Sequence, residues 1–361
     1  MNDDAGHRRA IRVLVVDDSA FMRAALSRLI ASEAGFEVVG TACSGSEALE
    51  KIASLDPDVV TLDVEMPGLN GLETLRAVMI QFPRPVIMVS AVTESDAEIT
   101  FDALAAGAFD YIPKQLSSSS LEIHHIRSDL VAKLRAAAGS PRLRCHAAVP
   151  RKPPKSVALA YPRVEFTPVI VALGTSTGGP KALQEILPRL PADFNVPILI
   201  VQHMPRGFTS PFAQRLNSLC SITVREAVHH DPLQSGVAYI APAGMHMTVE
   251  RPSDSQAFIN LDTQPDNSLH IPSVDVMMKS VAAAFKNRAM GVIMTGMGSD
   301  GAGGMKAIYG QAGLTIGQDA ASCMVYGMPR ACAELGVLCR VVPLAQIPSQ
   351  ILQATRYRKR A

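Results

Sequence analysis

The stretch Val169–Gly174, VIVALG, is a short apolar run that leads directly into GTSTGG, the segment that contains Ser176. Two more runs in the same half of the chain end at a polar side chain: Val196–Gln202 before His203, and Gly291–Thr295 before the glycine-rich GMGSDG that carries Asp300. Short apolar runs of this kind are typical of buried parallel strands, and ligands bind at the carboxyl ends of such strands. If the runs are neighbours, a hydroxyl, an imidazole and a carboxylate meet at one sheet edge, as serine acyl transfer requires.

Length and composition limit the class of protein. A chain of 361 residues predicts two domains, and its net charge of +1 argues against a nucleic-acid binder. The N-terminus MNDDAGHRRA lacks the apolar segment of a signal peptide, and no run approaches the ~20 apolar residues of a membrane-spanning helix. The six cysteines form no CxxC pair, which is typical of reduced thiols. We therefore expect a cytoplasmic protein without membrane insertion.

Residues 1–138 alternate between strand and helix patterns, which predicts a doubly wound parallel sheet with helices on both faces. The predicted strands are Ile11–Val16, Glu37–Ala42, Val59–Leu62, Pro85–Val89 and Phe109–Ile112. Ser19 is expected to cap the first helix, which would bury Phe21, Ala25, Leu26 and Leu29. The later predicted helices are Gly45–Ser54, Gly71–Ile80, Ser95–Ala105 and Leu121–Ala138.

The pattern breaks at residues 139–167, which are rich in proline and in arginine and lysine. Proline-rich stretches favour extended spacers, so we interpret this segment as a linker, with a basic docking arm as the alternative. A second α/β unit is predicted over residues 168–361.

Carboxylates follow two of the predicted N-terminal strands: Asp17 and Asp18 after the first, and Asp63 after the third. The parallel sheet places them at one edge, where their mutual repulsion calls for a cation. Oxygen ligands of this kind suit Mg²⁺. Ser90 and Lys114 end the fourth and fifth strands and are expected at the same edge, where they can contact an added anion.

This arrangement resembles the receiver domain of bacterial two-component response regulators. The matching stretches are VLVVDDSAFMR, DVVTLDVEMPGLNGLETLR, VIMVSA and AGAFDYIPK. The resemblance implies that Asp63 is phosphorylated, that Asp17, Asp18 and Asp63 hold Mg²⁺, that Ser90 and Lys114 contact the phosphoryl group and that Tyr111 is the aromatic switch residue. In such domains proline usually follows the lysine, whereas Gln115 follows it here.

The residues of the second unit leave several readings open. GTSTG fits the G-x-S-x-G nucleophile pattern, but a phosphate-binding loop or a plain turn before a helix at about Lys181–Leu187 also fits. Asp275 competes with Asp300 as the partner of an imidazole. Position directly after an apolar strand favours His203 and Asp300.

Residues 168 to about 352 resemble the catalytic domain of the chemotaxis protein-glutamate methylesterases. The matching segments are VALGTSTGGPKAL, ILIVQHMPRGFT, FAQRLNSL, VAYIAPAGMHM, PSVDVMMKSVA, VIMTGMGSDGAGGM and TIGQDAASCMVYGMP. The resemblance implies a flavodoxin-like receiver joined to a Rossmann-like esterase domain. It further implies that Ser176 is the nucleophile, His203 the general base and Asp300 its orienting partner, with the Met297 N–H as the oxyanion donor. We interpret Asp275 as structural and expect no chemical role for Cys323.

The implied function is phosphorylation-activated hydrolysis of glutamate γ-methyl esters on methyl-accepting chemoreceptors, with deamidation of receptor glutamines. A chemotaxis histidine kinase would be the phosphodonor, Mg²⁺ would serve the receiver, and the esterase would need no cofactor. Three other readings remain: a second domain that only binds a ligand, a DNA-binding output, and a hydrolase for another protein ester or amide. The second of these would need a basic helix-turn-helix, and the strand-rich C-terminal half suggests none.

Overall fold

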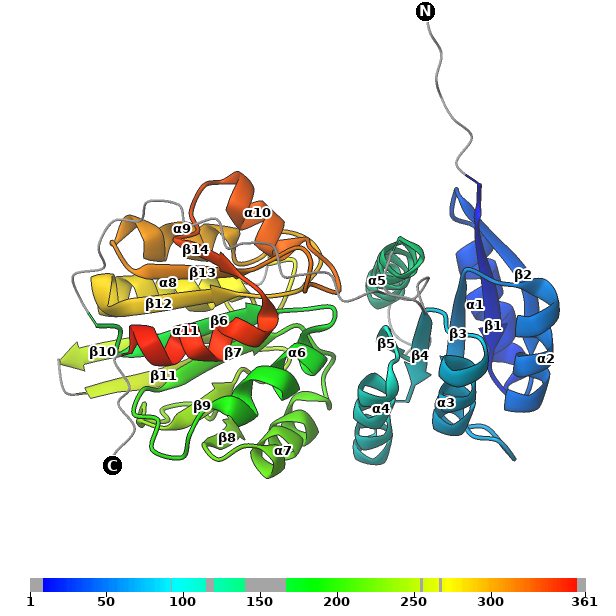
Figure 1. Ribbon diagram of the computed structural model, residues 1–361, viewed down its shortest axis with the longest axis horizontal. Coiled ribbons are helices and arrows are strands. Elements are labelled where there is room, and N and C mark those ends of the chain that lie inside the picture. The colour runs from blue at the N-terminus through cyan, green and yellow to red at the C-terminus, as the bar shows by residue number, and fades with distance from the viewer. Residues whose placement is uncertain are drawn as a thin grey trace, which may run out of the picture. The chain divides into compact units, whose positions relative to one another are not determined.

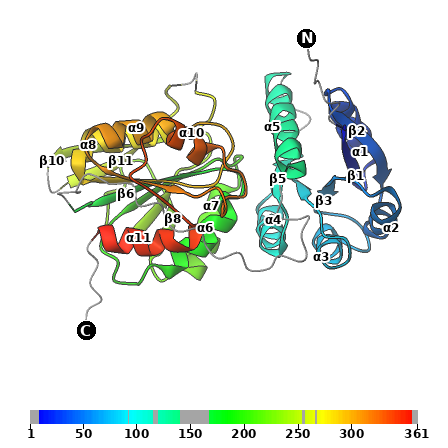
Figure 2. The same ribbon diagram turned by 45° about the horizontal axis from the view of Figure 1, so that its top comes forward.

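The computed structural model describes residues 9–91, 93–114, 120–139, 167–253, 256–265 and 268–355. The chain divides into two compact units, Met1–Arg151 and Lys152–Ala361. Both are layered α/β structures in which helices cover a central sheet (Figures 1 and 2). Gln115 lies outside the described residues. So do residues 140–166, which make up nearly all of the predicted linker.

The first unit contains a five-stranded parallel sheet in the order β2-β1-β3-β4-β5. The strands are β1 (Ile11–Val16), β2 (Phe36–Ala42), β3 (Val59–Asp63), β4 (Val86–Ser90) and β5 (Asp110–Pro113). The helices are α1 (Ala20–Ala31), α2 (Gly45–Leu55), α3 (Gly71–Gln81), α4 (Glu94–Ala106) and α5 (Ser120–Ala138). The predicted doubly wound fold of this half is confirmed, with each element within two residues of its expected position.

The local sequence explains these boundaries, with one error. Ser19 accepts a hydrogen bond from the Met22 N–H and caps α1 as predicted. The buried face of α1 runs through Leu26 and Ile30, whereas Phe21 is 73% exposed, so its predicted burial is wrong. At about 100° per residue, Phe21 lies about 140° around the helix from Leu26, and the buried stripe does not include it.

The second unit contains a seven-stranded parallel sheet in the order β14-β13-β12-β6-β7-β9-β8, and a separate antiparallel hairpin, β10-β11. The strands are β6 (Ile170–Thr175), β7 (Ile198–Gln202), β8 (Thr223–Glu226), β9 (Val237–Ile240), β10 (His246–Ser253), β11 (Gln256–Asp262), β12 (Ala289–Ile293), β13 (Leu314–Gln318) and β14 (Arg340–Val342). The α-helices are α6 (Gly179–Ile186), α7 (Thr209–Leu219), α8 (Val274–Phe285), α9 (Ala302–Gly310), α10 (Met328–Glu334) and α11 (Ile347–Ala354). Short 3₁₀ turns follow at η2 (Leu187–Arg189), η3 (Lys286–Arg288) and η4 (Leu344–Gln346).

The three apolar runs of the second unit are adjacent at its centre. β6 pairs with β12 on one side and with β7 on the other, and both pairings are parallel. All residues of these three strands are buried. Their continuous apolar character fits strands covered on both faces. The segments that contain Ser176, His203 and Asp300 therefore leave the sheet at the same edge, as predicted.

Helix α8 anchors the layer over β6. Its buried residues Val274, Met277, Met278 and Val281 belong to one hydrophobic cluster with residues of β6, β10 and α9. Ser273 caps this helix by accepting from the Val276 N–H. Within the residues that the structure describes, no helix combines the length and the apolar character needed to cross a membrane.

Replacing Asn70 by alanine should destabilise the first unit by about 1 kcal/mol. Asn70 and Glu73 form a capping box at the start of α3, so the change removes an acceptor for the Glu73 N–H and leaves that donor to water. A shift in the thermal unfolding transition of the first unit would measure the loss. Asn70→Asp, which keeps the acceptor, should retain most of the stability, and equal losses in both variants would contradict the capping role.

Candidate active site and phosphoryl-acceptor site

Hydrogen bonds between neighbouring strand ends bring the Ser176 and His203 segments together. The Thr295 carbonyl, just beyond β12, accepts from the Thr175 hydroxyl (2.8 Å) and from the Ser176 N–H (3.0 Å). The Gln202 side-chain amide donates to the carbonyls of Ser176 (3.0 Å) and His203 (2.9 Å). Because Thr175, Gln202 and Thr295 are buried, these bonds are shielded from water and fix the positions of three loops.

Glycine at position 296 allows the loop after β12 to approach Ser176. A Cβ atom at Gly296 would lie 2.9 Å from the Ser176 Cβ and 3.0 Å from its backbone nitrogen. Any larger residue would have to displace the segment that holds the hydroxyl. The sequence alone marks this position only as part of a glycine-rich stretch.

His203 and Asp300 are in direct contact. The His203 Nε2 lies 2.8 Å from the Asp300 Oδ2, and both side chains are about nine-tenths buried, with exposures of 10% and 11%. Asp300 also accepts from the Ser273 hydroxyl and from the N–H groups of Val274 and Asp275 at the start of α8. This contact makes Asp300, and not Asp275, the imidazole partner.

The surroundings of Asp300 favour its ionised form. Burial opposes the charge, but the hydrogen bond and charge of His203 outweigh it, together with the N–H groups of Asp275 and Val274. They hold the pKa of the Asp300 carboxyl well below its usual range. The start of a helix also stabilises negative charge. Asp300 is therefore a fixed anion that can orient the imidazole and stabilise an imidazolium.

The other ring nitrogen of His203 is available for chemistry. His203 Nδ1 is buried and has no hydrogen-bond partner within the described residues. The His203 backbone N–H donates to the Thr175 carbonyl (3.2 Å), so the imidazole segment begins next to the Ser176 segment. The ring of His270 stacks on His203, with ring centroids 4.0 Å apart. Sequence reasoning did not single out His270, which follows no strand pattern.

Backbone donors are also present at this edge. Within the described part of the chain, the N–H groups of Thr177 and Met297 have no hydrogen-bond acceptor. Thr177 follows Ser176 directly and lies two residues before α6, and Met297 follows Gly296. Sequence reasoning named Met297 but not Thr177, although a nucleophile elbow commonly uses the N–H of the residue after the nucleophile.

The remaining candidates of the second unit have structural contacts. Asp275 Oδ1 accepts from the Gly304 N–H (2.7 Å), which joins α8 to α9, in keeping with a structural role. His246 is buried and accepts from the Ser273 N–H, which positions the α8 cap. His229 and His230 contact each other, and the Leu261 N–H donates to His229 Nδ1. Cys323 is buried.

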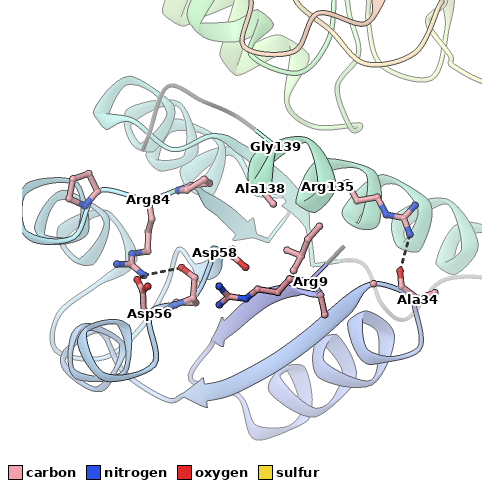
Figure 3. Close-up of a pocket in the computed structure, with 14 residues that line it drawn as sticks. Arg9, Ala34, Asp56, Asp58, Arg84, Arg135, Ala138 and Gly139 are labelled. Carbon is pink, nitrogen blue, oxygen red and sulfur yellow. Dashed lines mark hydrogen bonds and ion pairs between the residues drawn. The ribbon is translucent and has the colours of Figure 1, made fainter. Parts of the chain in front are cut away.

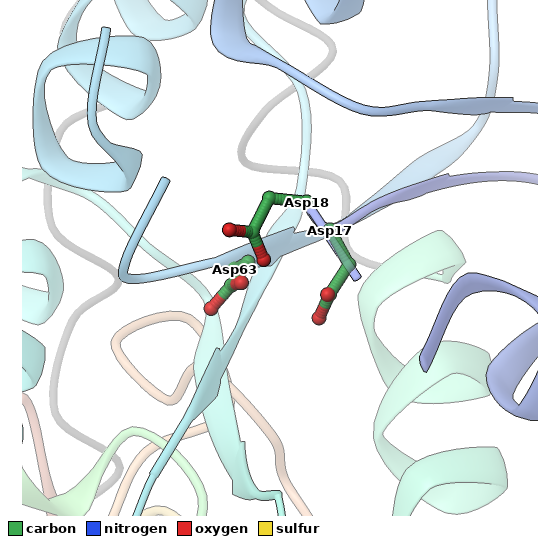
Figure 4. Close-up of side chains that lie close together, drawn as sticks. All are labelled: Asp17, Asp18 and Asp63. Carbon is green, nitrogen blue, oxygen red and sulfur yellow. The ribbon is translucent and has the colours of Figure 1, made fainter. Parts of the chain in front are cut away.

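The carboxylates of the first unit form a cluster at the carboxyl ends of β1 and β3. Oxygen atoms of Asp17, Asp18 and Asp63 lie within 4.8 Å of one another (Figure 4). The Lys114 ammonium contacts Asp63 (2.5 Å) and Asp17 (3.3 Å). Burial raises the pKa of Asp63 to about 6, the neighbouring Asp17 adds to this effect and Lys114 opposes it. The two carboxylates in turn raise the pKa of Lys114 against the effect of its burial.

Family models match both units of the chain. The CheB methylesterase model matches residues 171–351, and the response regulator receiver domain model matches residues 13–125. The chain belongs to the CheB methylesterase family. Its second unit is similar to the crystal structure of the Thermotoga maritima CheB methylesterase catalytic domain, with a TM-score of 0.50 and 37% identity, over 52% of this chain and 99% of that one.

Curated relatives of this CheB-family chain match it over nearly its whole length. A protein of Symbiobacterium thermophilum is 47% identical, over 96% of this chain and 98% of the relative, and is named protein-glutamate methylesterase/protein-glutamine glutaminase. A protein of Geobacter sulfurreducens with the same name and the number 1 is 45% identical, over 95% of this chain and 97% of the relative. The family assignment therefore covers both the receiver and the esterase unit.

The other predicted receiver residues of the CheB-family chain point inward. The Ser90 hydroxyl is buried, accepts from the Thr100 hydroxyl of α4 (2.9 Å) and donates to the Ala91 carbonyl (3.1 Å). The Tyr111 side chain is only 3% exposed. Lys133 of α5 donates to the Tyr111 carbonyl (2.7 Å), and its ammonium lies 5.5 Å from the centre of the tyrosine ring.

The receiver also contains a cavity of about 980 Å³, away from the carboxylate cluster (Figure 3). It lies at the amino ends of the strands, and its lining includes three arginines and two aspartates among alanine, glycine, proline and isoleucine residues. Arg84 pairs with Asp56 (3.4 Å), and Arg135 donates to the Ala34 carbonyl (3.3 Å). Two of the three lining arginines are therefore already engaged in contacts within the receiver.

Replacing Asp63 by asparagine should stabilise the receiver at neutral pH. The raised pKa of Asp63 means that the folded domain holds this proton more tightly than the unfolded chain. Ionisation therefore costs stability as the pH rises from about 4 to about 6, and the full cost is present above that range. In metal-free buffer at pH 7.5, Asp63→Asn should raise the free energy of unfolding by about 1–3 kcal/mol.

Calorimetry of the full chain at pH 7.5 and at pH 4 would measure this effect, which should nearly vanish at the lower pH. The control is Glu37→Gln, which neutralises an exposed carboxylate. An Asp63→Asn variant that is less stable than the native chain at pH 7.5 would contradict the interpretation.

Proposed function

We propose that this chain hydrolyses glutamate γ-methyl esters and deamidates glutamines in chemoreceptors, with Ser176 as the nucleophile. His203 is the general base, and Asp300 orients it. The proposal rests on the 2.8 Å contact between His203 and Asp300 at the strand edge that also carries Ser176. The names of the curated relatives supply the substrate class.

The hydrogen-bond pattern suggests the course of the reaction. With Nε2–H donating to Asp300, the unpaired Nδ1 of His203 accepts the proton of the Ser176 hydroxyl. The serine oxygen bonds to the ester carbonyl carbon, and the tetrahedral intermediate collapses as His203 returns the proton to the departing methoxide. Methanol leaves, and a water molecule then hydrolyses the glutamyl-enzyme by the same proton transfers. With a glutamine substrate, the leaving group is ammonia.

Backbone N–H groups would stabilise the tetrahedral oxyanion. The unused donors of Thr177 and Met297 flank the Ser176 segment on two sides, which suits an oxyanion hole made by α6 and by the loop after β12. Each such donor typically contributes about 3 kcal/mol to transition-state stabilisation. No side-chain electrophile is then needed.

Ser176→Ala should reduce methanol release from methylated receptor by at least about 10⁴-fold, because it removes the attacking atom. Phosphorylation of the receiver should be unchanged. Ser299→Ala, at an exposed serine in the glycine-rich loop beside Asp300, serves as the matched control and should retain activity. Methanol release by Ser176→Ala at a rate near that of the native enzyme would remove Ser176 from the mechanism.

We further propose that Asp63 accepts the phosphoryl group from a chemotaxis histidine kinase. The three clustered carboxylates fit a hard divalent cation, so Asp17, Asp18 and Asp63 would hold Mg²⁺. The ion would supply positive charge that neutralises Asp63 and the incoming phosphoryl oxygens. Lys114, which contacts Asp63, would pair with the added phosphate. The activated receiver then stimulates the esterase, and we expect a cytoplasmic location, where kinase and receptor substrates are available.

Ser90 would have to change partners to contact the phosphoryl group. Its hydroxyl now bonds to Thr100 and to the Ala91 carbonyl, so phosphorylation must replace at least one of these bonds. Movement of the Ser90 backbone and of the buried Tyr111 ring would then transmit the change to α4 and α5. In this scheme Thr100 holds the unphosphorylated conformation.

Thr100→Val should make the receiver easier to phosphorylate. It removes one neutral hydrogen bond of the resting state, worth about 1 kcal/mol, so the half-saturating concentration of acetyl phosphate should fall about fivefold. Phosphorylated protein can be measured on Phos-tag gels in Mg²⁺ buffer. In a Ser90→Ala background the same change should have no effect, and an equal effect in both backgrounds would contradict the role of the Ser90–Thr100 bond.

A further inference from the structure

An arginine lies close to the catalytic histidine and is not used by the mechanism. Arg206 is exposed, follows His203 by three residues, and rests its guanidinium against the backbone at Gly244, in the turn between β9 and β10. A Cβ atom at Gly244 would lie 2.5 Å from the Arg206 Cζ, so a larger residue there would move the guanidinium from this position. Gly244 also has a φ of +85°, which again favours glycine.

The turn under Arg206 is joined to the active-site loop. The Gly244 N–H donates to the Ile271 carbonyl (3.0 Å), and the preceding residue, His270, stacks on the His203 ring. The neighbouring Ala243 N–H donates to the Thr209 hydroxyl at the start of α7 (3.3 Å). Three loops therefore meet at the rim beside the imidazole, and Arg206 lies on the outside of this junction.

Arg206 has no acidic partner in the part of the chain that the structure describes, either as an ion pair or as a hydrogen bond. Two apolar side chains on the same loops are also exposed: Met245, next to Gly244, is 42% exposed, and Leu269, next to His270, is 80% exposed. One unpaired cation beside two exposed apolar side chains is complementary to a peptide that presents a carboxylate and an apolar face.

We propose that Arg206 determines substrate specificity by binding a carboxylate that flanks the susceptible glutamyl ester in an acidic peptide segment. Met245 and Leu269 contact apolar side chains of the same segment. This inference rests on the proposed esterase function, because it concerns the substrate of that site. It assigns Arg206 to substrate binding and not to proton transfer, for which His203 and Asp300 suffice.

The expected effect is modest and confined to binding. An ion pair between exposed groups changes an equilibrium constant by roughly twofold to fivefold, and salt weakens it. If the ester and the transition state engage Arg206 equally, its loss raises KM and leaves kcat unchanged. The contribution of Arg206 to substrate binding should depend on the charge of the peptide and not on the ester itself.

Two synthetic peptides test the proposal with the full-length enzyme. Both carry one central glutamate γ-methyl ester, and they differ only in having aspartate or the neutral isostere asparagine on either side of it. Methanol release gives KM and kcat for each. The native enzyme should show a KM about two to five times lower for the aspartate peptide, and 500 mM NaCl should reduce the difference.

Arg206→Gln should raise KM for the aspartate peptide to the value of the asparagine peptide, with both kcat values unchanged, and Arg206→Lys should restore part of the preference. The control Arg288→Gln removes an exposed arginine that precedes β12, at the opposite edge of the sheet, and should behave as the native enzyme.

The inference is overturned if Arg206→Gln leaves the aspartate preference intact, if it affects both peptides equally, or if Arg288→Gln has the same effect. Failure of the native enzyme to release methanol from either peptide and from methylated receptor would instead overturn the esterase proposal itself. Methanol release without any aspartate preference in the native enzyme would overturn the role of Arg206 alone.

Discussion

The carbonyl oxygen of Thr295 is the point on which the esterase site depends. It accepts two hydrogen bonds, from the Thr175 hydroxyl and the Ser176 N–H, and so joins the end of β6 to the loop after β12. The Gln202 amide extends this connection to β7 through the Ser176 and His203 carbonyls. These groups are buried, so each unmade bond would cost the full desolvation of a polar group. Three loops that differ widely in sequence position are thereby held in one arrangement.

The choice of Asp300 over Asp275 follows from helix geometry. Both carboxylates lie near the start of α8, but only Asp300 faces the free N–H groups of Val274 and Asp275. Asp275, within the first turn, instead accepts from Gly304 and holds α9 against α8. The charge of Asp300 is thus stabilised before the imidazole is protonated, and its orientation is set by three donors besides His203.

Sequence patterns predicted the parts of the structure that depend on strand order. Short apolar runs located β6, β7 and β12, and the parallel-sheet rule then placed Ser176, His203 and Asp300 at one edge. Position after an apolar strand favoured Asp300 over Asp275 but could not decide between them, because that choice depends on which backbone N–H groups each carboxylate meets in space. Patterns also missed His270, because it lies in a loop and loops have no hydrophobic periodicity. They did not predict that Phe21 is exposed, because the spacing of apolar residues locates the edge of a buried helix face only to within about one residue.

Each of the two sites lies at the carboxyl edge of the sheet of its own unit, and the electrostatics of the two sites are opposite. In the receiver, a second buried carboxylate lies beside Asp63, so burial and Asp17 raise the pKa of Asp63 to about 6 in spite of Lys114. In the esterase, Asp300 accepts from the Ser273 hydroxyl and from two backbone N–H groups and contacts the His203 imidazole, and these partners lower its pKa in spite of its burial. The first arrangement is short of positive charge and suits a carboxylate that takes up a cation and a phosphoryl group. In the second arrangement, hydrogen-bond donors stabilise the negative charge of Asp300, which suits a carboxylate that stays ionised throughout a proton-transfer cycle.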